Sequence, residues 1–201
     1  NKVNFEYEAS VASGIPIIRS IKEGLISNKI FKLIGILNGT SNYILSRMEQ
    51  TGKKFNEILN EAKQYGYAET NPKSDLNGDD VASKIKILSS LCFHTLISKN
   101  NILIDGIYNI ENKDIINVKK LGYRIKLLGI TEMINKVIFE RVHPCLVDIN
   151  SYIGNINGVF NASIINSFPA GQTIMQGEGA GPGPTSSALM SDLYSILRGN
   201  I

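Results

Sequence analysis

The order of strand-like and helical segments limits the fold of this chain more than any other feature. The first strand-like segments are separated by helical patterns, whereas the later ones follow one another with only turns between them. Strand character is found at residues 3–11, 31–37, 102–107, 125–130, 137–142, 159–168 and 171–175. A doubly wound fold would alternate strand and helix throughout, so this order favours the α+β class. We expect one mixed β-sheet covered by helices on one face.

Helical patterns occupy most of the remaining chain. Apolar periodicity and capping residues mark helices at residues 16–25, 38–50, 55–65, 76–93, 113–121 and 185–197. Gly52, Gly66 and Gly122 suit helix ends, and Thr185 is expected to cap the last helix. Asn135 falls in the turn between two of the predicted strands. The pattern therefore predicts helices before, between and after the strands.

Composition and charge exclude several classes of protein. The 201 residues, 43% of them hydrophobic, suffice for one core, and we treat residues 1–201 as one domain. The formal net charge is +3 with both signs interspersed, so we expect no nucleic-acid partner. No apolar run reaches about 18 residues, so we expect a cytoplasmic protein without a membrane segment. The chain begins at Asn1 without Met, and we expect a segment of a longer protein.

The most informative stretch is GYAETNPKSDLNGDDVASK, residues 66–84. It gathers carboxylates and lysines in a turn-rich loop that leads directly into the apolar helix predicted at 76–93. Charges at a loop-to-helix junction can be held close together and partly buried, which is how proteins prepare groups for proton transfer. This stretch is therefore the candidate active site.

Helical phase divides the charged residues of this stretch. At about 100° per residue, Asp80 and Lys84 fall on the apolar face, four residues apart. Asp79 and Lys86 fall on the opposite, solvent-facing side. A buried lysine is costly without a carboxylate beside it, so we expect the inward pair to interact. Spacing alone leaves two interpretations open: an ion pair that reaches to water, or a functional pair.

Residues 66–84 resemble the signature of homoserine dehydrogenases: a Gly-aromatic pair, a Glu, a Pro, then Asp-Leu-x-Gly-x-Asp and a Lys four residues on. Three further stretches resemble the same family in the same order: EASVASGIPIIRSIKEGL (8–25), GILNGTSNYIL (35–45) and GEGAGPGPTSSALMSDL (177–193). The resemblance spans nearly the whole chain. It implies interconversion of L-homoserine and L-aspartate 4-semialdehyde in threonine, methionine and isoleucine biosynthesis. It also implies a homodimer whose catalytic and dimerisation domain is similar to the C-terminal domain of glyceraldehyde-3-phosphate dehydrogenase.

The resemblance also assigns roles to individual residues. Lys84 would be the general acid–base, which gives a proton to the carbonyl oxygen as hydride arrives and removes it in the reverse reaction. Asp80 would hold Lys84 and the substrate, and Glu69 would bind the substrate's amino group. The rest of the small-molecule substrate pocket would be lined by Asp75, Tyr67, Gly39 and Thr40.

Simpler structural roles remain open for several of these residues. Asp75 could be a helix N-cap, and capping is the default role for Thr40 or Ser41. The glycines at 177–181 could simply make a tight turn into the last helix.

The glycine-rich stretch GEGAGP, residues 177–182, lies between a predicted strand and a predicted helix. Pro182 takes the sixth position, no acidic partner follows about 20 residues on, and no βαβ unit surrounds it. We therefore reject it as a complete dinucleotide fingerprint. In the family that the chain resembles, a separate N-terminal domain carries that fingerprint. We expect Gly181 to contribute an edge of the NADP or NAD site, and the isolated segment to be inactive without the missing domain.

The stretch at 8–25 resembles the family's monovalent cation site, which usually holds sodium. The ligands in the family are a Glu side chain and backbone carbonyl groups, which fall here at Glu8, Val11, Ser13 and Ile15. Hard oxygen ligands suit such an ion. On the residues alone, Glu8 could simply lie at a strand end.

Two other functions compete with this interpretation. The first is a non-catalytic dimerisation or regulatory fragment of such an enzyme. The second is a semialdehyde dehydrogenase that forms a covalent thioester, which needs a nucleophilic Cys at a helix start with a nearby His. Cys92 lies late on a buried helix face and Cys145 follows Pro144, so neither cysteine suits that role.

Overall fold

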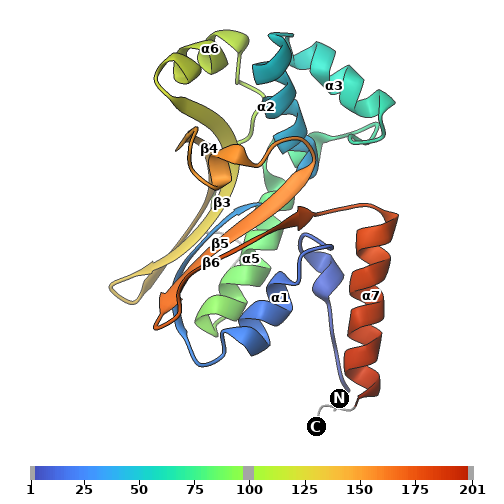
Figure 1. Cartoon of the computed structure of the whole chain (residues 1–201), viewed down its shortest axis with the longest axis vertical. Coiled ribbons are helices and arrows are strands. Elements are labelled where there is room, and N and C mark those ends of the chain that lie inside the picture. The colour runs from blue at the N-terminus through green and yellow to red at the C-terminus, as the bar shows by residue number, and fades with distance from the viewer. Residues whose placement is uncertain (1–2, 97–101, 199–201) are drawn as a thin grey trace.

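The centre of the computed structural model, which describes residues 3–96 and 102–198, is one six-stranded sheet with the order β2-β4-β3-β1-β5-β6 (Figure 1). The strands are β1 (Lys29–Ile36), β2 (Leu103–Ile104), β3 (Tyr123–Ile134), β4 (Val137–Asp148), β5 (Phe160–Phe168) and β6 (Gly171–Glu178). β2 runs parallel to β4, and the other neighbouring pairs are antiparallel. The prediction of a mixed sheet in an α+β fold is confirmed.

Helices precede, interrupt and follow the strands. They are α1 (Ile17–Arg19), α2 (Gly39–Thr51), α3 (Phe55–Gln64), α4 (Lys73–Leu76), α5 (Asp79–Phe93), α6 (Asn112–Lys120) and α7 (Pro182–Leu197). Shorter turns are η1 (Glu8–Ser10), η2 (Ser20–Gly24) and η4 (Ile153–Asn155). α1 continues directly into η2, a π-helical turn, so together they make the predicted helix at 16–25. α5 lies against the sheet, whereas α7 stands to one side of it (Figure 1).

The predicted hairpin between β3 and β4 has the turn that its sequence favours. Asn135 and Lys136 both have positive φ angles, 51° and 66°, and Ile134 pairs with Val137 across the turn. Two-residue hairpin turns of this kind need positive φ at both positions, and Asn tolerates that conformation better than most residues. The turn position of Asn135 was therefore predicted correctly.

The predicted strand at 3–11 is wrong. Residues 8–10 form the 3₁₀ turn η1, and the carboxylate of Glu8 accepts hydrogen bonds from the backbone N–H groups of Ile18 (2.9 Å) and Arg19 (2.8 Å). The alternation of aromatic and polar residues imitated a strand, but Glu8 instead caps the first turn of α1. The N-terminal segment then packs beside α7, because Glu8 N donates to Asp192 Oδ2 at 2.9 Å.

Two predicted helix starts also differ from the structure. The helix predicted from residue 76 begins at Asp79, because Gly78 adopts a left-handed conformation (φ 91°) that separates the short turn α4 from α5. The last helix begins at Pro182 with Gly181 as its N-cap residue. Thr185 therefore lies inside the first turn, where its N–H donates to the Gly181 carbonyl at 3.1 Å, and does not cap the helix.

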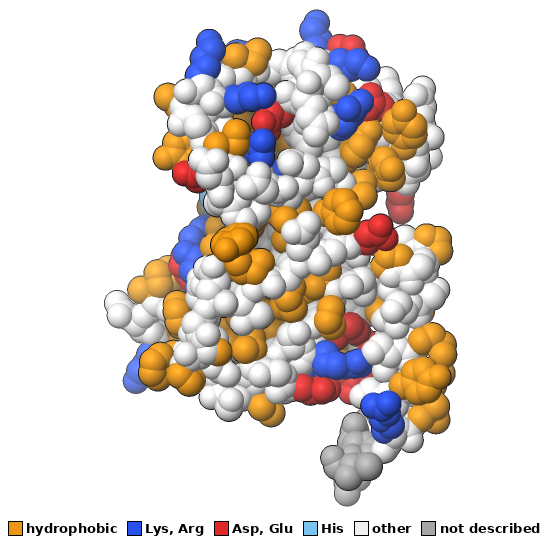
Figure 2. All heavy atoms as spheres, in the orientation of Figure 1, with side chains coloured by type: hydrophobic (Ala, Val, Ile, Leu, Met, Phe, Trp, Pro, Cys, Tyr) orange, Lys and Arg blue, Asp and Glu red, His pale blue; other side chains and the backbone are white. Residues whose placement is uncertain are grey.

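The core has two parts on opposite faces of the sheet. The larger lies under the helices and joins Leu33 of β1 and Leu127 of β3 to Ile85 and Leu88 of α5. The smaller lies on the other face and contains Ile36, Leu128, Ile130, Val147, Ile153, Ile156, Ala162 and Ile164. In Figure 2, hydrophobic side chains gather over the region that Figure 1 gives to β5 and β6. Helices thus cover chiefly one face, as expected.

The chain has no candidate for a membrane-spanning helix among its described residues, since none there combines sufficient length with sufficient hydrophobicity.

Gly129 in the middle of β3 sets how closely α5 approaches the sheet. A Cβ atom at this position would lie 2.8 Å from Val81 Cγ1 and closer still to Ile85 Cγ1. Only a glycine leaves room for these side chains, because side chains pack at about 3.5–4.0 Å between carbon atoms. Because α5 lies this close to the sheet, its N-terminal turn is held near the end of β1.

We expect Gly129→Ala to lower the free energy of unfolding by about 1–3 kcal/mol, the usual cost of overpacking a core. Gly24→Ala is the matched control, because a Cβ there would meet no atom within 4 Å. The control should change stability by less than about 0.5 kcal/mol. Urea unfolding curves of both variants measure this, and equal stability for Gly129→Ala and the parent would contradict the packing described here.

Candidate active site

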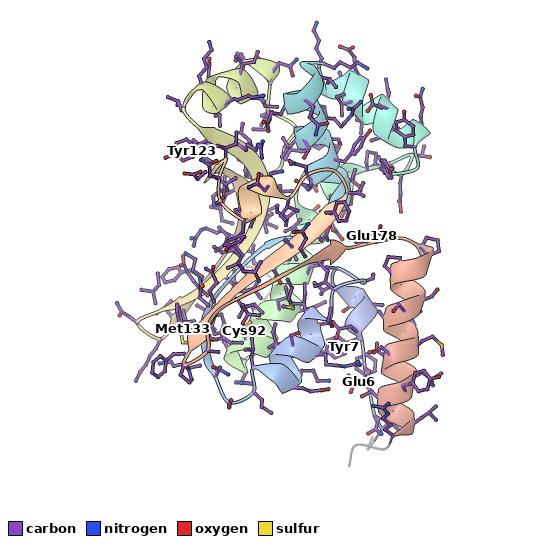
Figure 3. All side chains as sticks on the ribbon, in the orientation of Figure 1. Glu6, Tyr7, Cys92, Tyr123, Met133 and Glu178 are labelled. Atoms are coloured by element: carbon purple, nitrogen blue, oxygen red, sulfur yellow. The ribbon has the colours of Figure 1, made fainter. Side chains whose placement is uncertain are left out.

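A cavity of about 590 Å³ opens between the start of α5 and the glycine stretch before α7. Glu178, labelled in Figure 3, marks the point at which β6 leads into that stretch. The lining residues are Asn38, Gly39, Thr40, Tyr65, Gly66, Tyr67, Glu69, Asp75, Asp80, Lys84, Val159, Asn161, Glu178, Gly179, Ala180 and Gly181. This lining includes every residue that the sequence predicted for catalysis, substrate binding and cofactor contact. Segments far apart in the chain therefore meet at one cavity, and the roles of their residues remain predictions.

Lys84 is the only lysine in the lining that the described residues form, and it is held by two acceptors. Its Nζ atom donates to the carbonyl of Leu37 at 2.7 Å and to Asp80 Oδ2 at 2.8 Å. The Lys84 side chain is 19% exposed and that of Asp80 is 29% exposed. The pair is thus partly shielded rather than solvated, and the predicted inward phase of both side chains is correct.

Asn38 is a cavity residue to which the sequence analysis gave no role at the site. Its Nδ2 atom donates to Asp75 Oδ1 at 2.8 Å and to Asp80 Oδ2 at 2.9 Å, and its Oδ1 atom accepts from Ser41 N at 2.8 Å. Asn38 therefore caps α2 with its oxygen and bridges two carboxylates with its nitrogen. The sequence signal was an Asn directly before a helix, which predicts a cap but says nothing about the distant carboxylates.

The capping alternatives are resolved by these contacts. Asp75 lies within α4, whose N-cap residue is Pro72, so Asp75 is not the N-cap. The Thr40 hydroxyl donates to the Tyr67 carbonyl at 2.6 Å, and the Ser41 hydroxyl to the Asn38 carbonyl at 3.2 Å. Thr40 therefore ties the start of α2 to the predicted substrate-binding turn.

Tyr67 is positioned by a cluster of aromatic and charged side chains. Its ring packs on Tyr43 at a centroid distance of 4.9 Å, and the Tyr43 hydroxyl donates to Glu61 Oε1 at 2.6 Å. Burial, together with the Glu61 hydrogen bond, raises the pKa of Tyr43 to about 12. Hydrogen bonds from Arg47 and Tyr43 lower the pKa of Glu61 to about 2. Glu69, by contrast, is exposed, although it also lines the cavity.

The opposite wall is the glycine stretch at 177–181. Gly179 O accepts from Ser13 N and Glu178 O accepts from Gly14 N, both at 3.1 Å. Gly181 has a φ of 112°, which favours glycine, and it is the N-cap residue of α7. It lines the cavity and also starts the helix, so the tight turn into α7 is confirmed and the cofactor contact of Gly181 stays a prediction. β6 is antiparallel to β5, so the stretch does not belong to a βαβ unit.

The residues predicted to bind sodium lie in one tight turn before α1. Ala12 within it has a positive φ of 48°, and the carbonyl of Ile15 accepts a hydrogen bond from Ile17 N at 2.7 Å. Burial raises the pKa of the Glu8 carboxyl, while the N–H groups of Arg19 and Ile18 oppose that shift. Carboxylate and carbonyl oxygens each have further lone pairs, so these contacts do not use up their capacity to bind a cation, and the sodium site stays a prediction.

The outward phase predicted for Lys86 is only partly right. Lys86 does point away from the cavity, but it is half-buried rather than fully solvated. Its charge opposes the rise that burial gives to the pKa of Glu140, a buried residue of β4. The outer side of α5 packs near β4, which is why the solvent prediction failed.

The two cysteines lie outside the cavity lining. Cys92 is buried near the C-terminal end of α5, well away from Glu178 in Figure 3, and burial raises the pKa of its thiol to about 12. Burial also raises the pKa of Cys145. Thiolates, not thiols, are the nucleophiles, so neither residue suits a thioester mechanism.

Lys126 is a second lysine that the sequence did not single out. It is 1% exposed, and its Nζ atom donates to Asn42 Oδ1 (3.0 Å), Asn157 Oδ1 (3.2 Å) and the carbonyl of Ile156. Asn42 also donates to the carbonyl of Gly158 at 3.0 Å. Lys126 therefore fixes the loop that carries the cavity residue Val159.

Comparison with known proteins identifies the family. Residues 16–194 match the family model described as homoserine dehydrogenase. A homoserine dehydrogenase of Neisseria gonorrhoeae is 44% identical over 193 residues, which are 96% of this chain and 44% of that protein. The crystal structure of a homoserine dehydrogenase from Thiobacillus denitrificans has a TM-score of 0.93 and 43% identity, and covers 96% of this chain and 44% of that one.

A mutant of a hyperthermophilic archaeal homoserine dehydrogenase, solved in complex with NADPH, is more distant. It has a TM-score of 0.80 and 25% identity, over 96% of this chain and 55% of that chain.

The fold and the cavity thus define an α+β domain of the dehydrogenase type. The chain belongs to the homoserine dehydrogenase family, and it spans less than half the length of the Neisseria relative.

The pH dependence of stability tests the burial of Lys126, which fixes the loop that carries Val159. Burial lowers its pKa from 10.5 to about 8, so between these values the unfolded chain binds a proton that the folded chain does not. Stability should therefore rise with pH across this window, by up to about 3 kcal/mol. Lys126→Met should remove that rise. Unfolding measured from pH 8 to pH 10 in both proteins checks this, and parallel curves would contradict it.

Proposed function

We propose that this chain is the substrate-binding and proton-transferring part of a homoserine dehydrogenase that interconverts L-homoserine and L-aspartate 4-semialdehyde. The observation that carries the proposal is the contact of Lys84 with Asp80 and Leu37 O inside a cavity that also holds Glu69, Asp75 and Tyr67. Family membership and the match to homoserine dehydrogenases support it. This reaction would be a step in the biosynthesis of threonine, methionine and isoleucine.

Lys84 would move the proton. In the reductive direction, the aldehyde carbon receives a hydride and the carbonyl oxygen takes a proton from Lys84 Nζ, which gives the alcohol. In the oxidative direction, neutral Lys84 takes the hydroxyl proton as the hydride leaves. Asp80 and the Leu37 carbonyl fix the direction of Nζ, so that the amine is positioned before the substrate arrives.

The other cavity residues would bind and orient the amino acid. Glu69 would accept hydrogen bonds from the substrate ammonium, a charge-assisted contact. Gly39 and Thr40 lie at the N-terminus of α2, where backbone N–H groups and the helix dipole favour a carboxylate. A substrate with an ammonium and a carboxylate at one end would thus present its other end to Lys84.

NADP or NAD would supply or accept the hydride. Gly179 and Gly181 line the cavity without side chains. A flat ring would therefore be able to approach the backbone on this side of the cavity. Gly181 would contact the edge of the cofactor, and the rest of the dinucleotide would be bound by a nucleotide-binding domain outside this sequence. One family relative has been solved with NADPH.

A sodium ion would be held by the Glu8 side chain and the carbonyl groups of Val11, Ser13 and Ile15. The turn that contains these residues donates two backbone hydrogen bonds to the glycine stretch, at Glu178 and Gly179. The ion would therefore stiffen the wall opposite Lys84 and take no part in proton transfer.

We expect Lys84→Ala to lower kcat by roughly 10²–10⁴, the usual scale for loss of a general acid–base. Asp80→Asn should lower kcat as well. The controls are Lys86→Ala and Asp79→Asn on the same helix, which should keep kcat because neither residue lines the cavity. Steady-state rates are measured in the protein with its nucleotide-binding domain, and the isolated segment should show no turnover. Unchanged kcat in Lys84→Ala would contradict the role of Lys84 in proton transfer, whereas a parent protein without turnover would favour a non-catalytic dimerisation or regulatory fragment.

The second core cluster supports a homodimer. On the strand positions of the face opposite the helices, exposed apolar side chains include Ile174 (37%), Phe139 (47%), Ile134 (49%) and Val137 (52%). These apolar side chains, which share the face with the ion-paired Lys32, Glu132 and Arg141, would pack against the same face of a second copy related by a two-fold axis.

We expect sedimentation equilibrium to give a dimer at micromolar concentration. Ile174→Glu should dissociate it, because the charge would be buried between the two faces. Ile116→Glu on α6, at a site that is 50% exposed, is the control and should remain dimeric. A monomeric parent protein, or a dimer in Ile174→Glu, would count against this interface.

A further inference from the structure

Asn161 near the start of β5 lines the cavity and has an unpaired, buried polar atom. The residue is 1% exposed and lines the cavity, and its Oδ1 atom has no hydrogen-bond partner within residues 3–96 and 102–198. Buried polar atoms in folded proteins are nearly always paired, because leaving one unpaired costs stability. An exception at a cavity wall indicates a partner that arrives with a ligand.

The amide of Asn161 lies directly under the glycine stretch. A Cβ atom on Gly179 would be 2.7 Å from Asn161 Oδ1 and still closer to Cγ and Nδ2, so a larger residue at 179 would force the amide to move. Asn161 also pairs with Gly177 in the register of β5 and β6. The oxygen is buried as the amide stands, and the final torsion of Asn is soft, so a contact with a ligand would require the amide to turn toward the cavity.

The charged side chains of the cavity limit which ligand group would donate a hydrogen bond to Asn161 Oδ1. Asp75, Asp80 and Glu69 enter the cavity from α4, α5 and the turn before them, whereas Asn161 belongs to the wall of the glycine stretch. A neutral amide oxygen accepts hydrogen bonds and carries no charge, so it suits an N–H donor. The proposed ligands contain two such donors: the nicotinamide carboxamide and the substrate ammonium.

We propose that Asn161 is a ligand-binding residue whose Oδ1 atom accepts a hydrogen bond from an N–H group of the bound cofactor or substrate. This inference rests on the proposed function and adds a contact to it. It explains why the chain keeps an unpaired buried oxygen and a glycine at position 179, since functional sites tolerate locally unfavourable groups.

Ser163 provides a matched control on the same strand. It lies two residues further along β5, so it projects from the same face, and its buried Oγ atom likewise has no partner among the described residues. Ser163 is absent from the cavity lining. Asn161→Ala and Ser163→Ala therefore each remove an unpaired buried group, but only the first removes a side chain that lines the cavity.

The first measurement is ligand-induced thermal stabilisation of the protein with its nucleotide-binding domain. NADP and L-homoserine, separately and together, should raise the melting temperature of the parent protein and of Ser163→Ala. The shift should be smaller in Asn161→Ala for the ligand that contacts the oxygen. Neither variant loses a hydrogen bond present in the ligand-free chain, and Asn161→Ser serves as a second variant if Asn161→Ala folds poorly.

The second measurement separates the two donors. The 3-acetylpyridine analogue of the cofactor has a methyl ketone in place of the carboxamide and so lacks its N–H groups. If the carboxamide is the donor, the parent should bind NADP more tightly than the analogue by roughly 3- to 10-fold, the value of one hydrogen bond. Asn161→Ala should abolish that preference. If the ammonium is the donor, Asn161→Ala should raise the KM for homoserine by a similar factor and leave the preference unchanged.

The inference is overturned if Asn161→Ala behaves like Ser163→Ala in both the cofactor preference and the KM for homoserine. The proposed function fails differently, because the parent protein itself would then not oxidise homoserine. The comparison of binding affinities for the two cofactors still tests Asn161 in that case, since it needs no turnover.

Discussion

The structure of this site depends on one carboxylate, that of Asp80, which accepts hydrogen bonds from both Lys84 Nζ and Asn38 Nδ2. The three residues come from α5 and from the end of β1, so this contact joins the sheet to the helix that carries the candidate acid–base. Lys84 and Asn38 each donate a hydrogen bond to the Asp80 carboxylate. Asn38 also donates to Asp75, so its amide separates the two carboxylates. Without the amide, two carboxylates would face each other, which is unfavourable in a partly buried site.

The remainder of the fold holds the two sides of this contact in place. Gly129 lets α5 lie close to the sheet, and the short turn α4 before Gly78 brings Asp75 back toward Asn38. Lys126 and Asn42 fix the loop that carries Val159. The far wall is tied to the N-terminal turn through Ser13 and Gly14, so hydrogen bonds hold the segments on both sides of the cavity. Such preorganisation is what proton and hydride transfer require.

Local patterns in the sequence predicted the parts of this structure that local physics controls. The helical period placed Asp80 and Lys84 on one face, and strand pairs joined by turns indicated an α+β sheet. The resemblance to a family then predicted that Glu69, Tyr67 and Gly181 belong to the same site. The N-terminal strand failed because alternation alone cannot tell a strand from a turn whose side chain caps a neighbouring helix, as Glu8 does.

The contacts that sequence reasoning missed are all long-range. Asn38 meets Asp75 and Asp80 from 37 and 42 positions away, and Lys126 meets Asn42 from 84 positions away. Neither hydrophobic period nor capping preference carries that information, since both describe neighbours along the chain. The unpaired oxygen of Asn161 is likewise visible only once β5 lies beside the glycine stretch.

Chemical rescue tests the central claim, that the amine of Lys84 carries the proton, most directly. Primary amines of increasing basicity are added to Lys84→Ala in the protein with its nucleotide-binding domain, and homoserine oxidation is followed by cofactor reduction. If Lys84 transfers the proton, the rate should rise with amine concentration and depend on amine basicity, because a free amine takes the place of Nζ. An absence of rescue by every amine, while homoserine and cofactor still bind the variant, would contradict the assignment of proton transfer to Lys84.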